Sequence, residues 1–176
     1  IYALSKASSF HICEFYKKIY NLKVYGAIFF NHESERRTEE YVSRKITKAA
    51  SKIYLNKQKF LYLGDINTKI DWGYARDYVE ASYKLMQLRK PDYFVIGSGK
   101  ATSIKFFAKT AFEYVGLNYE KYVRIDKKLF RKSKNKILVA DIKKAKRTFN
   151  FKIKTDIKKL IKIMMDNDLK IEKNNE

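Results

Sequence analysis

A tyrosine and a lysine at the start of the chain have the spacing of an acid/base pair. Tyr2 and Lys6 lie in a segment whose apolar residues recur every three or four positions, which predicts an amphipathic helix over residues 2–21. Residues with this spacing share one face of a helix. The ammonium would then lie near the phenol and favour the phenolate, which can act as a base near neutral pH. Tyr41 and Lys45 form a second such pair, so the spacing alone does not choose between the two.

A polar segment follows the next expected element. Residues 23–30 (KVYGAIFF) form an apolar, β-rich run that is typical of a buried strand in a parallel sheet. Residues 31–37 (NHESERR) come directly after it and include an amide, an imidazole and two guanidinium groups. These groups suit phosphate and amide recognition, and ligands of open α/β sheets bind beyond the carboxyl ends of strands. The segment is a candidate binding loop, although a plain surface turn would have the same composition.

The rest of the chain alternates expected helices and strands. Helices are expected over residues 38–54, 74–88, 102–115 and 142–148 and at the end of the chain, and strands over residues 59–63, 93–96, 122–125 and 137–139. The helix at 38–54 would carry acidic residues in its first turn, where the helix dipole favours them. Gly116 would cap the helix at 102–115. This alternation predicts an α/β fold with a parallel sheet.

Composition excludes several classes of protein. The chain has 176 residues, of which 45% are hydrophobic, so it suits one globular domain or a piece of one and excludes wholesale disorder. No run reaches the roughly 18 apolar residues of a membrane helix, and there is no targeting signal. The single cysteine, Cys13, excludes an intramolecular disulfide and a cysteine-based zinc site, which fits a cytoplasmic protein without a metal. The chain begins at Ile1 rather than at methionine, so we expect that its true N-terminus is missing.

The net charge of +20 is a feature that nucleic-acid-binding proteins share. Lysines are spread along the whole chain, however, and the densest basic stretch, residues 127–136, has Phe130 as its only aromatic residue. Base-stacking surfaces interleave more aromatic residues than that. A solvated basic surface is therefore the favoured interpretation, and a nucleic-acid-binding module is the less favoured alternative.

Taken in order, the motifs resemble those of one enzyme family. The sequence contains Y-x-x-x-K, FFNHES-x-RR, EYVSRKIT, LYLGD, DWGYARDYVEA, DYFVIGSGKATSIKFF and DIKKAKRTFNFK, followed by MMDNDL. Over residues 2–169 the chain resembles the GDP-mannose 4,6-dehydratases, which belong to the extended short-chain dehydrogenase/reductase superfamily. The Y-x-x-x-K pair is shared by the whole superfamily. NHES, followed by RKIT and DYVEA at these distances, is specific to the dehydratases.

The resemblance implies a fold and a division into domains. We expect the C-terminal part of a Rossmann-type doubly wound parallel sheet, together with the smaller α/β substrate-binding domain of this superfamily. Residues 1–30 and 71–97 would belong to the NADP-binding domain, and residues 31–70 and 98–176 to the nucleotide-sugar-binding domain. In this family the glycine-rich phosphate loop, the catalytic serine or threonine and the catalytic glutamate precede the tyrosine. The chain would thus be the C-terminal half of a longer enzyme, inactive by itself.

The resemblance also implies a reaction and a set of site residues. The parent enzyme would convert GDP-mannose to GDP-4-keto-6-deoxymannose, a step towards GDP-fucose, with tightly bound NADP as internal hydride carrier. By motif, Tyr2 would be the catalytic base and Lys6 would bind the nicotinamide ribose. His32 and Arg37 would make further contacts with NADP. GDP-mannose would be contacted by Asn31, Val42 and Lys45, and its diphosphate by Arg131. Such enzymes form dimers or tetramers through helices that include the one carrying the tyrosine.

Five positions depart from the family pattern. Ile70 stands where an arginine is usual, Thr38 replaces a glycine and Glu35 replaces a proline. Lys132 and Lys134 replace a proline and a glutamate in a segment expected to contact the nucleotide. Loss of an arginine near the diphosphate would remove a contact worth about 1.5–3 kcal/mol. A related dehydratase or epimerase acting on a different nucleotide sugar therefore stays open as an alternative.

Overall fold

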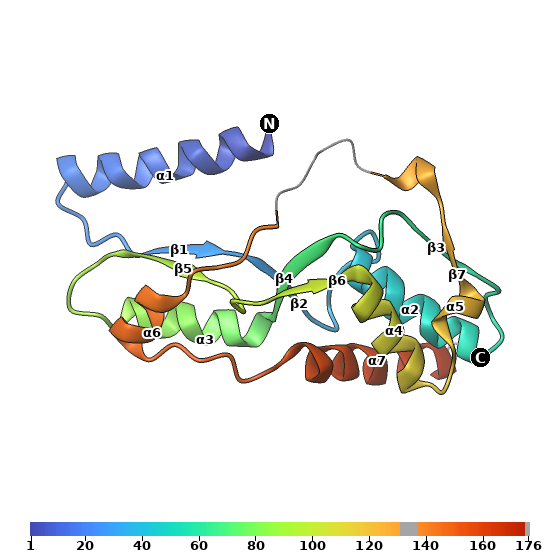
Figure 1. The fold of residues 1–176 in the computed structure, drawn as a ribbon. Helices are drawn as coiled ribbons and strands as arrows, with labels where there is room; N and C mark the ends of the chain where they lie inside the picture. Colours follow the sequence, from blue (N-terminus) through green and yellow to red (C-terminus); the bar gives the residue numbers. More distant parts are fainter. Residues whose placement is uncertain (131–136, 175–176) are drawn as a thin grey trace.

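The computed structural model describes residues 1–130 and 137–174 of the chain. The elements are α1 (Tyr2–Ile19), β1 (Gly26–Phe29), β2 (Asn31–Glu33), α2 (Val42–Tyr54), β3 (Leu61–Leu63), β4 (Lys69–Tyr74), α3 (Ala75–Met86), β5 (Tyr93–Ile96), β6 (Ala101–Ser103), α4 (Ile104–Tyr114), α5 (Tyr119–Tyr122), β7 (Val123–Ile125), the 3-10 helix η1 (Lys127–Leu129), α6 (Lys143–Phe149) and α7 (Ile157–Asn174). Figure 1 shows β1 and β5 lying between α1 on one side and α3 and α6 on the other. The helices α2, α4, α5 and α7 lie at the end of the molecule away from α6.

The strands form three small sheets in which parallel pairing dominates. β1 pairs with β5 and β3 pairs with β7, both in parallel. In the third sheet, ordered β2-β4-β6, β2 and β4 are parallel, whereas β4 and β6 are antiparallel. The prediction of an α/β fold with parallel pairing is thus confirmed.

Several boundaries differ from the sequence-based expectations. Two expectations are confirmed: the strand at 93–96 is β5, and Gly116 follows α4 with a left-handed φ of 73°. The strand expected at 137–139 is wrong, because these residues form no strand and their side chains are exposed. The acidic first turn expected in the second helix is also wrong, since α2 begins at Val42 and both Glu39 and Glu40 precede it.

The apolar core consists of two clusters of buried residues. The larger cluster joins α2, β3, β4, α4, α5 and α7, and within it the rings of Trp72 and Phe107 lie 5.0 Å apart. The smaller cluster joins α3, β5 and the segment 140–151. The division into a Rossmann part and a nucleotide-sugar part stays a prediction.

The first helix lies outside both clusters. None of its residues is buried, so the apolar positions that predicted an amphipathic helix are largely exposed. Its contacts with the sheet include the side chain of Tyr93 at the start of β5, whose ring centroid lies 5.0 Å from that of Phe10. The ammonium group of Lys17 lies 5.4 Å from the centroid of the same Tyr93 ring. Side chains thus hold α1 beside β5, without any of its residues entering the core.

A buried carboxylate fixes the turn after β5. Asp71 of β4 is 1% exposed. Its Oδ1 accepts hydrogen bonds from the backbone N–H of Ser98 at 2.8 Å and from the Ser98 hydroxyl at 2.6 Å. Its Oδ2 accepts from the backbone N–H groups of Gly99 and Ala140, each at 3.0 Å. The glycine-serine-glycine turn at 97–99 therefore presents two of its N–H groups to a carboxylate of the protein itself.

Candidate functional site

The predicted acid/base pair lies in the first two turns of α1. Figure 1 shows α1 running antiparallel to β1, so that its first turn lies towards the carboxyl end of that strand. The Tyr2 ring is 76% exposed, and the Nζ atom of Lys6 lies 5.4 Å from its centroid. The two side chains therefore share a face of the helix, as their spacing predicts.

The predicted loop over residues 31–37 begins with a strand of three residues, whereas residues 34–37 form a loop, as expected. Asn31–Glu33 form β2 and pair with Trp72–Tyr74 of β4. The hydroxyl of Tyr78 in α3 donates to the Asn31 carbonyl at 3.2 Å. Burial raises the pKa of the Tyr78 phenol far above its usual value, so this hydroxyl stays protonated and remains a donor. The main chain of the predicted substrate contact Asn31 is thus fixed by two neighbouring elements.

The imidazole of His32 is oriented by three neighbours. Its Nδ1 lies 3.0 Å from the Phe30 carbonyl oxygen. Because a carbonyl only accepts, this hydrogen bond requires the proton on Nδ1, and in the neutral ring Nε2 is then the acceptor. The ring centroid lies 5.0 Å from that of Tyr78 and 5.4 Å from that of Phe29. His32 is therefore held in one tautomer and one orientation, with Nε2 able to accept a hydrogen bond.

Arg37 is held between an acid and an aromatic ring. Its Nε lies 3.2 Å from Oε2 of Glu33, and its guanidinium carbon lies 3.3 Å from the ring centroid of Tyr41. Burial raises the pKa of the Glu33 carboxyl above its ordinary value, although the Arg37 guanidinium opposes that effect. A guanidinium stacked on a ring loses little freedom when it binds an anion. Tyr41 of the second Tyr-x-x-x-Lys pair thus serves here as a platform for Arg37.

The remaining predicted contacts lie at the start of α2, with one exception. Val42 and Lys45 occupy the first turn of this helix, are half-buried, and follow the loop that carries Arg37. Asn31, His32, Arg37, Val42 and Lys45 therefore belong to one strand–loop–helix unit. The predicted diphosphate contact, Arg131, and the departures Lys132 and Lys134 lie outside the described residues.

Two further departures from the family pattern have structural roles. Ile70 pairs with Thr102 across β4 and β6 and packs against the larger core cluster. Glu35 accepts a hydrogen bond from the Tyr74 hydroxyl through its carboxylate, at 3.4 Å. Each residue is thus used by the fold, whatever its effect on a ligand.

Two hollows on the described surface lie away from these residues. One, of about 350 Å³, lies beside Lys57, Lys59 and Tyr122. The other, of about 680 Å³, lies between α4 and α7 beside Lys109 and Lys162. Neither is lined by the residues that the sequence predicts for the site.

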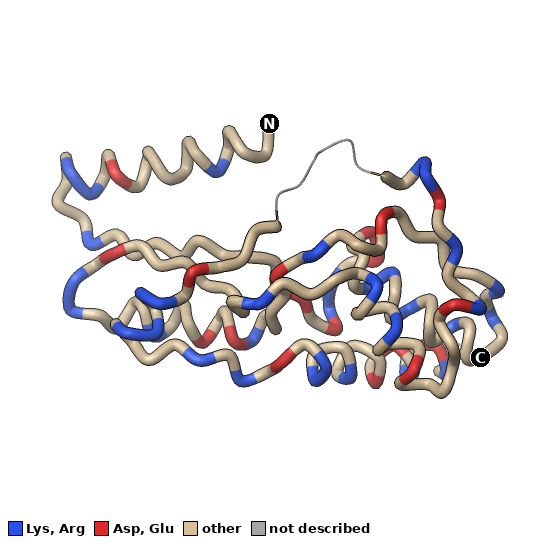
Figure 2. Tube along the Cα trace, viewed as in Figure 1, with Lys and Arg blue, Asp and Glu red and all other residues tan. Residues whose placement is uncertain are grey.

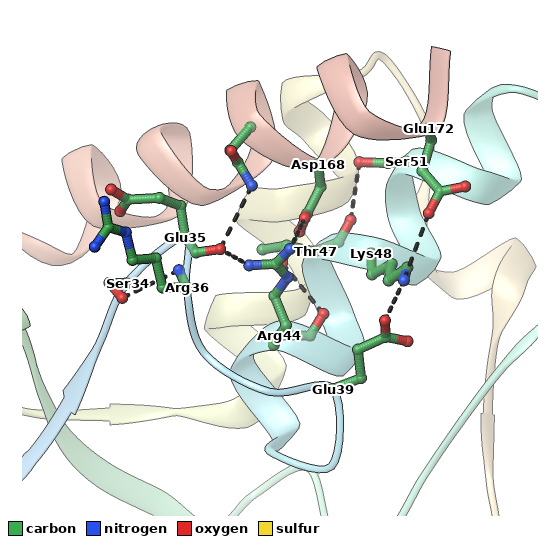
Figure 3. A network of polar contacts seen from close by, with 11 residues as sticks. Ser34, Glu35, Arg36, Glu39, Arg44, Thr47, Lys48, Ser51, Asp168 and Glu172 are labelled. Atoms are coloured by element: carbon green, nitrogen blue, oxygen red, sulfur yellow. Dashed lines mark hydrogen bonds and ion pairs between the residues drawn. The ribbon is translucent and has the colours of Figure 1, made fainter. Parts of the chain in front are cut away.

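A set of buried polar residues supports the strand–loop–helix unit, and the sequence analysis did not predict it. Figure 3 shows Arg44 and Thr47 of α2 facing Asp168 of α7. Arg44 Nη2 lies 2.7 Å from Asp168 Oδ1, and the Thr47 hydroxyl donates to Asp168 Oδ2 at 2.6 Å. Burial raises the pKa of the Asp168 carboxyl, against the effects of Thr47 and Arg44. The signal in the sequence was an aspartate on the apolar stripe of α7, four residues after the buried Met164.

Charge does not single out another site. Figure 2 shows lysine and arginine distributed over the helices and the connecting segments, rather than gathered along one face. Among the described residues, no helix is both long enough and apolar enough to cross a membrane. Neither observation points to a nucleic-acid groove or to a membrane-spanning helix.

Sequence comparisons identify relatives along the whole chain. The sequence model of a family described as GDP-mannose 4,6 dehydratase matches residues 1–164. GDP-mannose 4,6 dehydratase 1 of Arabidopsis thaliana is 41% identical over 172 residues, which cover 98% of this chain and 48% of that protein. The human GDP-mannose 4,6 dehydratase is 31% identical, with 99% of this chain and 51% of that protein covered. The chain thus spans about half the length of these curated relatives.

Solved structures agree on the fold. RMD from Pseudomonas aeruginosa, complexed with NADPH, superposes with a TM-score of 0.89 at 16% identity, covering 97% of this chain and 56% of that one. The dTDP-glucose 4,6-dehydratase of Bacillus anthracis, in complex with NAD, gives a TM-score of 0.80 at 17% identity, covering 99% and 53%. These matches confirm the expected Rossmann-type α/β fold. The match to residues 1–164 establishes that this chain belongs to the GDP-mannose 4,6-dehydratase family.

Proposed function

We propose that the protein containing this chain converts GDP-mannose to GDP-4-keto-6-deoxymannose with NADP as its cofactor, and that this chain supplies the C-terminal half of the enzyme. The observation that carries the proposal is membership of the family over residues 1–164, with both members of the tyrosine-lysine pair present. Tyr2 and Lys6 share one face of α1, and the predicted contacts Asn31 and His32 follow the carboxyl end of β1 in the chain.

The geometry supports separate roles for the two residues of the pair. Tyr2 would remove the proton of the sugar 4-hydroxyl, and its exposure leaves the phenol accessible to a substrate. Lys6, whose Nζ lies near the Tyr2 ring, would hold the nicotinamide ribose. When bound, NADP supplies a hydride acceptor and donor. The net reaction is loss of one water, because the hydrogen removed from C4 is returned at C6, from which the hydroxyl leaves.

The residues near β2 fit a phosphorylated dinucleotide. The stacked Arg37 guanidinium is suited to a phosphate, and the fixed tautomer of His32 leaves an acceptor for a hydroxyl or amide donor. Asn31, Val42 and Lys45 would contact GDP-mannose from the same unit, and Arg131 would contact its diphosphate. These assignments make one strand–loop–helix unit the meeting point of cofactor and substrate.

Two further properties belong to the proposal. A homo-oligomer, a dimer or tetramer, would cover the exposed apolar side chains of α1, such as those of Phe15 and Ile19. A cytoplasmic location fits a chain with one free cysteine, Cys13. Light scattering of the complete protein after size-exclusion chromatography would measure the assembly, and a monomer would contradict the first property.

The test is a turnover assay on the complete protein, expressed with the coding sequence upstream of Ile1. With NADP bound, we expect GDP-mannose to lose the mass of one water, and Tyr2→Phe to abolish nearly all turnover while GDP-mannose still binds. Tyr16→Phe is the matched control, because Tyr16 is an exposed tyrosine on the same helix. Undiminished turnover in Tyr2→Phe would remove Tyr2 from the mechanism. A wild-type protein that binds NADP yet leaves GDP-mannose unchanged would direct the search to other nucleotide sugars.

A further inference from the structure

The loop between β2 and α2, residues 34–41, has few bonds of its own. Within it, the Arg37 N–H donates to the Ser34 carbonyl at 3.1 Å, and the Tyr41 N–H donates to the Thr38 carbonyl at 3.3 Å. Most of its residues are exposed or half-buried. A loop with so few internal bonds needs support from other elements if it is to hold Arg37 in one place.

The first support reaches this loop from α7 through Arg44. Arg44 Nη1 donates to the Glu35 carbonyl, while Nη2 of the same guanidinium meets Asp168. Arg44 is 7% exposed and Asp168 is 1% exposed, so both charges are withdrawn from water. Asn167, next to Asp168, donates from Nδ2 to the same Glu35 carbonyl at 3.4 Å. Figure 3 shows these contacts converging on Glu35 from α2 and α7.

The second support reaches the other end of the loop through Lys48. Lys48 of α2 contacts the Glu39 carboxylate, and its Nζ lies 3.8 Å from Oε1 of Glu172 in α7. Glu172 is buried, whereas Glu39 is exposed. Figure 3 shows Lys48 lying between the two carboxylates. Both ends of the loop are thus linked to α7 by a cation of α2.

We propose that Arg44 and Asp168 are positioning residues, which hold the 34–41 loop so that Arg37 is presented to the cofactor. This inference rests on the proposed function, because that function makes Arg37 a cofactor contact. One guanidinium bridges two partners, and its planar fork fixes their relative geometry more strictly than the point charge of an ammonium does. The C-terminal helix thereby sets cofactor affinity although the proposed cofactor contacts lie on other elements.

The experiment compares three variants of the complete protein. Arg44→Lys keeps a charge opposite Asp168 but loses the second arm of the fork, and Asp168→Asn keeps the shape but loses the charge. Asp166→Asn is the matched control, because Asp166 lies on the same helix and pairs with Lys162 instead. We would measure amide hydrogen exchange of the 34–41 peptide, the thermal midpoint, the NADPH dissociation constant and kcat.

We expect exchange in the loop to accelerate and the NADPH dissociation constant to rise about ten-fold in Arg44→Lys and Asp168→Asn, with Asp166→Asn like the wild type. In Arg44→Lys the thermal midpoint should change little. Unchanged loop exchange, or unchanged NADPH affinity, in a folded Arg44→Lys protein would overturn the inference. Wild-type protein that fails to bind NADPH would overturn the proposed function instead, while exchange that still depends on Arg44 would uphold the anchoring of the loop.

Discussion

Replacing Asp71 with asparagine would test the buried carboxylate that fixes the turn after β5. In the wild type, Oδ1 accepts from the N–H and hydroxyl of Ser98, and Oδ2 accepts from the N–H groups of Gly99 and Ala140. Asparagine has one oxygen and one NH₂ group, and the NH₂ group cannot accept a hydrogen bond. In either orientation of the amide, its NH₂ group faces either the two donors of Ser98 or the N–H groups of Gly99 and Ala140.

The better orientation sets the size of the effect. If the amide oxygen faces Gly99 and Ala140, the NH₂ group faces Ser98, whose hydroxyl can rotate and accept. The backbone N–H of Ser98 then has no acceptor, and one buried, unsatisfied donor costs about 1–3 kcal/mol. Loss of the charge weakens the bonds that remain. We therefore expect Asp71→Asn to lower the free energy of unfolding by about 2–4 kcal/mol.

Asp77→Asn provides the comparison that makes this test specific. Asp77 is also buried, but a single oxygen, Oδ2, accepts from the backbone N–H groups of both Lys154 and Thr155, at 3.1 and 3.0 Å. An amide oxygen can take that place, so the expected loss is about 1 kcal/mol. Urea denaturation of the complete protein would measure both variants. A smaller loss for Asp71→Asn than for Asp77→Asn would refute the reasoning.

Three other perturbations follow from the same structure. Burial raises the pKa of the Asp168 carboxyl, so the folded protein binds this proton more tightly than the unfolded chain, and stability from this group grows as pH falls from the raised pKa towards the ordinary carboxyl value. Urea denaturation over a series of decreasing pH should show a growing advantage of wild type over Asp168→Asn, and a shrinking advantage would contradict the direction of the shift. Phe112→Ala removes a fully buried ring that stacks on Tyr122, so it should lower the free energy of unfolding by about 3–5 kcal/mol in the same assay. A loss below about 1 kcal/mol would show that neighbouring side chains fill the cavity. Gly73→Ala would place a methyl carbon 2.4 Å from Cε2 of the buried Tyr78, so we expect a loss of about 1–3 kcal/mol, checked by thermal unfolding, and an unshifted midpoint would mean that this ring can move.

The sequence predicts those elements whose own residues determine their structure. Tyr93–Ile96 are an apolar run and form β5 with those bounds. β2 and β6 are three residues long and polar, and they are strands only because β4 lies between them. Ile137–Val139 have the composition of a strand but no pairing partner, and their side chains are exposed. Pairing between distant segments decides these cases, and composition does not contain that information.

The candidate site also contains features that the sequence predicts and features that it does not. Motif spacing places Tyr2 and Lys6 on one helical face, and the structure agrees with that placement. The contacts that the family resemblance implies in β2 and α2 stay predictions. The support from Arg44 and Asp168 could not be read from spacing, because the partners belong to helices far apart in the sequence. A polar residue on an apolar stripe was the available signal, and it indicates burial without naming the partner.

The hydrogen bonds that join α7 to the 34–41 loop and to α2 constrain the order in which the protein can fold during synthesis. Asn167 and the carbonyl that it holds are 132 residues apart in sequence, and Thr47 and Asp168 are 121 residues apart. A ribosome therefore releases the loop long before it makes the helix that fixes it. A product that stops short of α7 would lack the contacts that Asn167 and Asp168 make with this loop and with α2. The loop that carries Arg37 can therefore reach its final arrangement only after α7 has been synthesised.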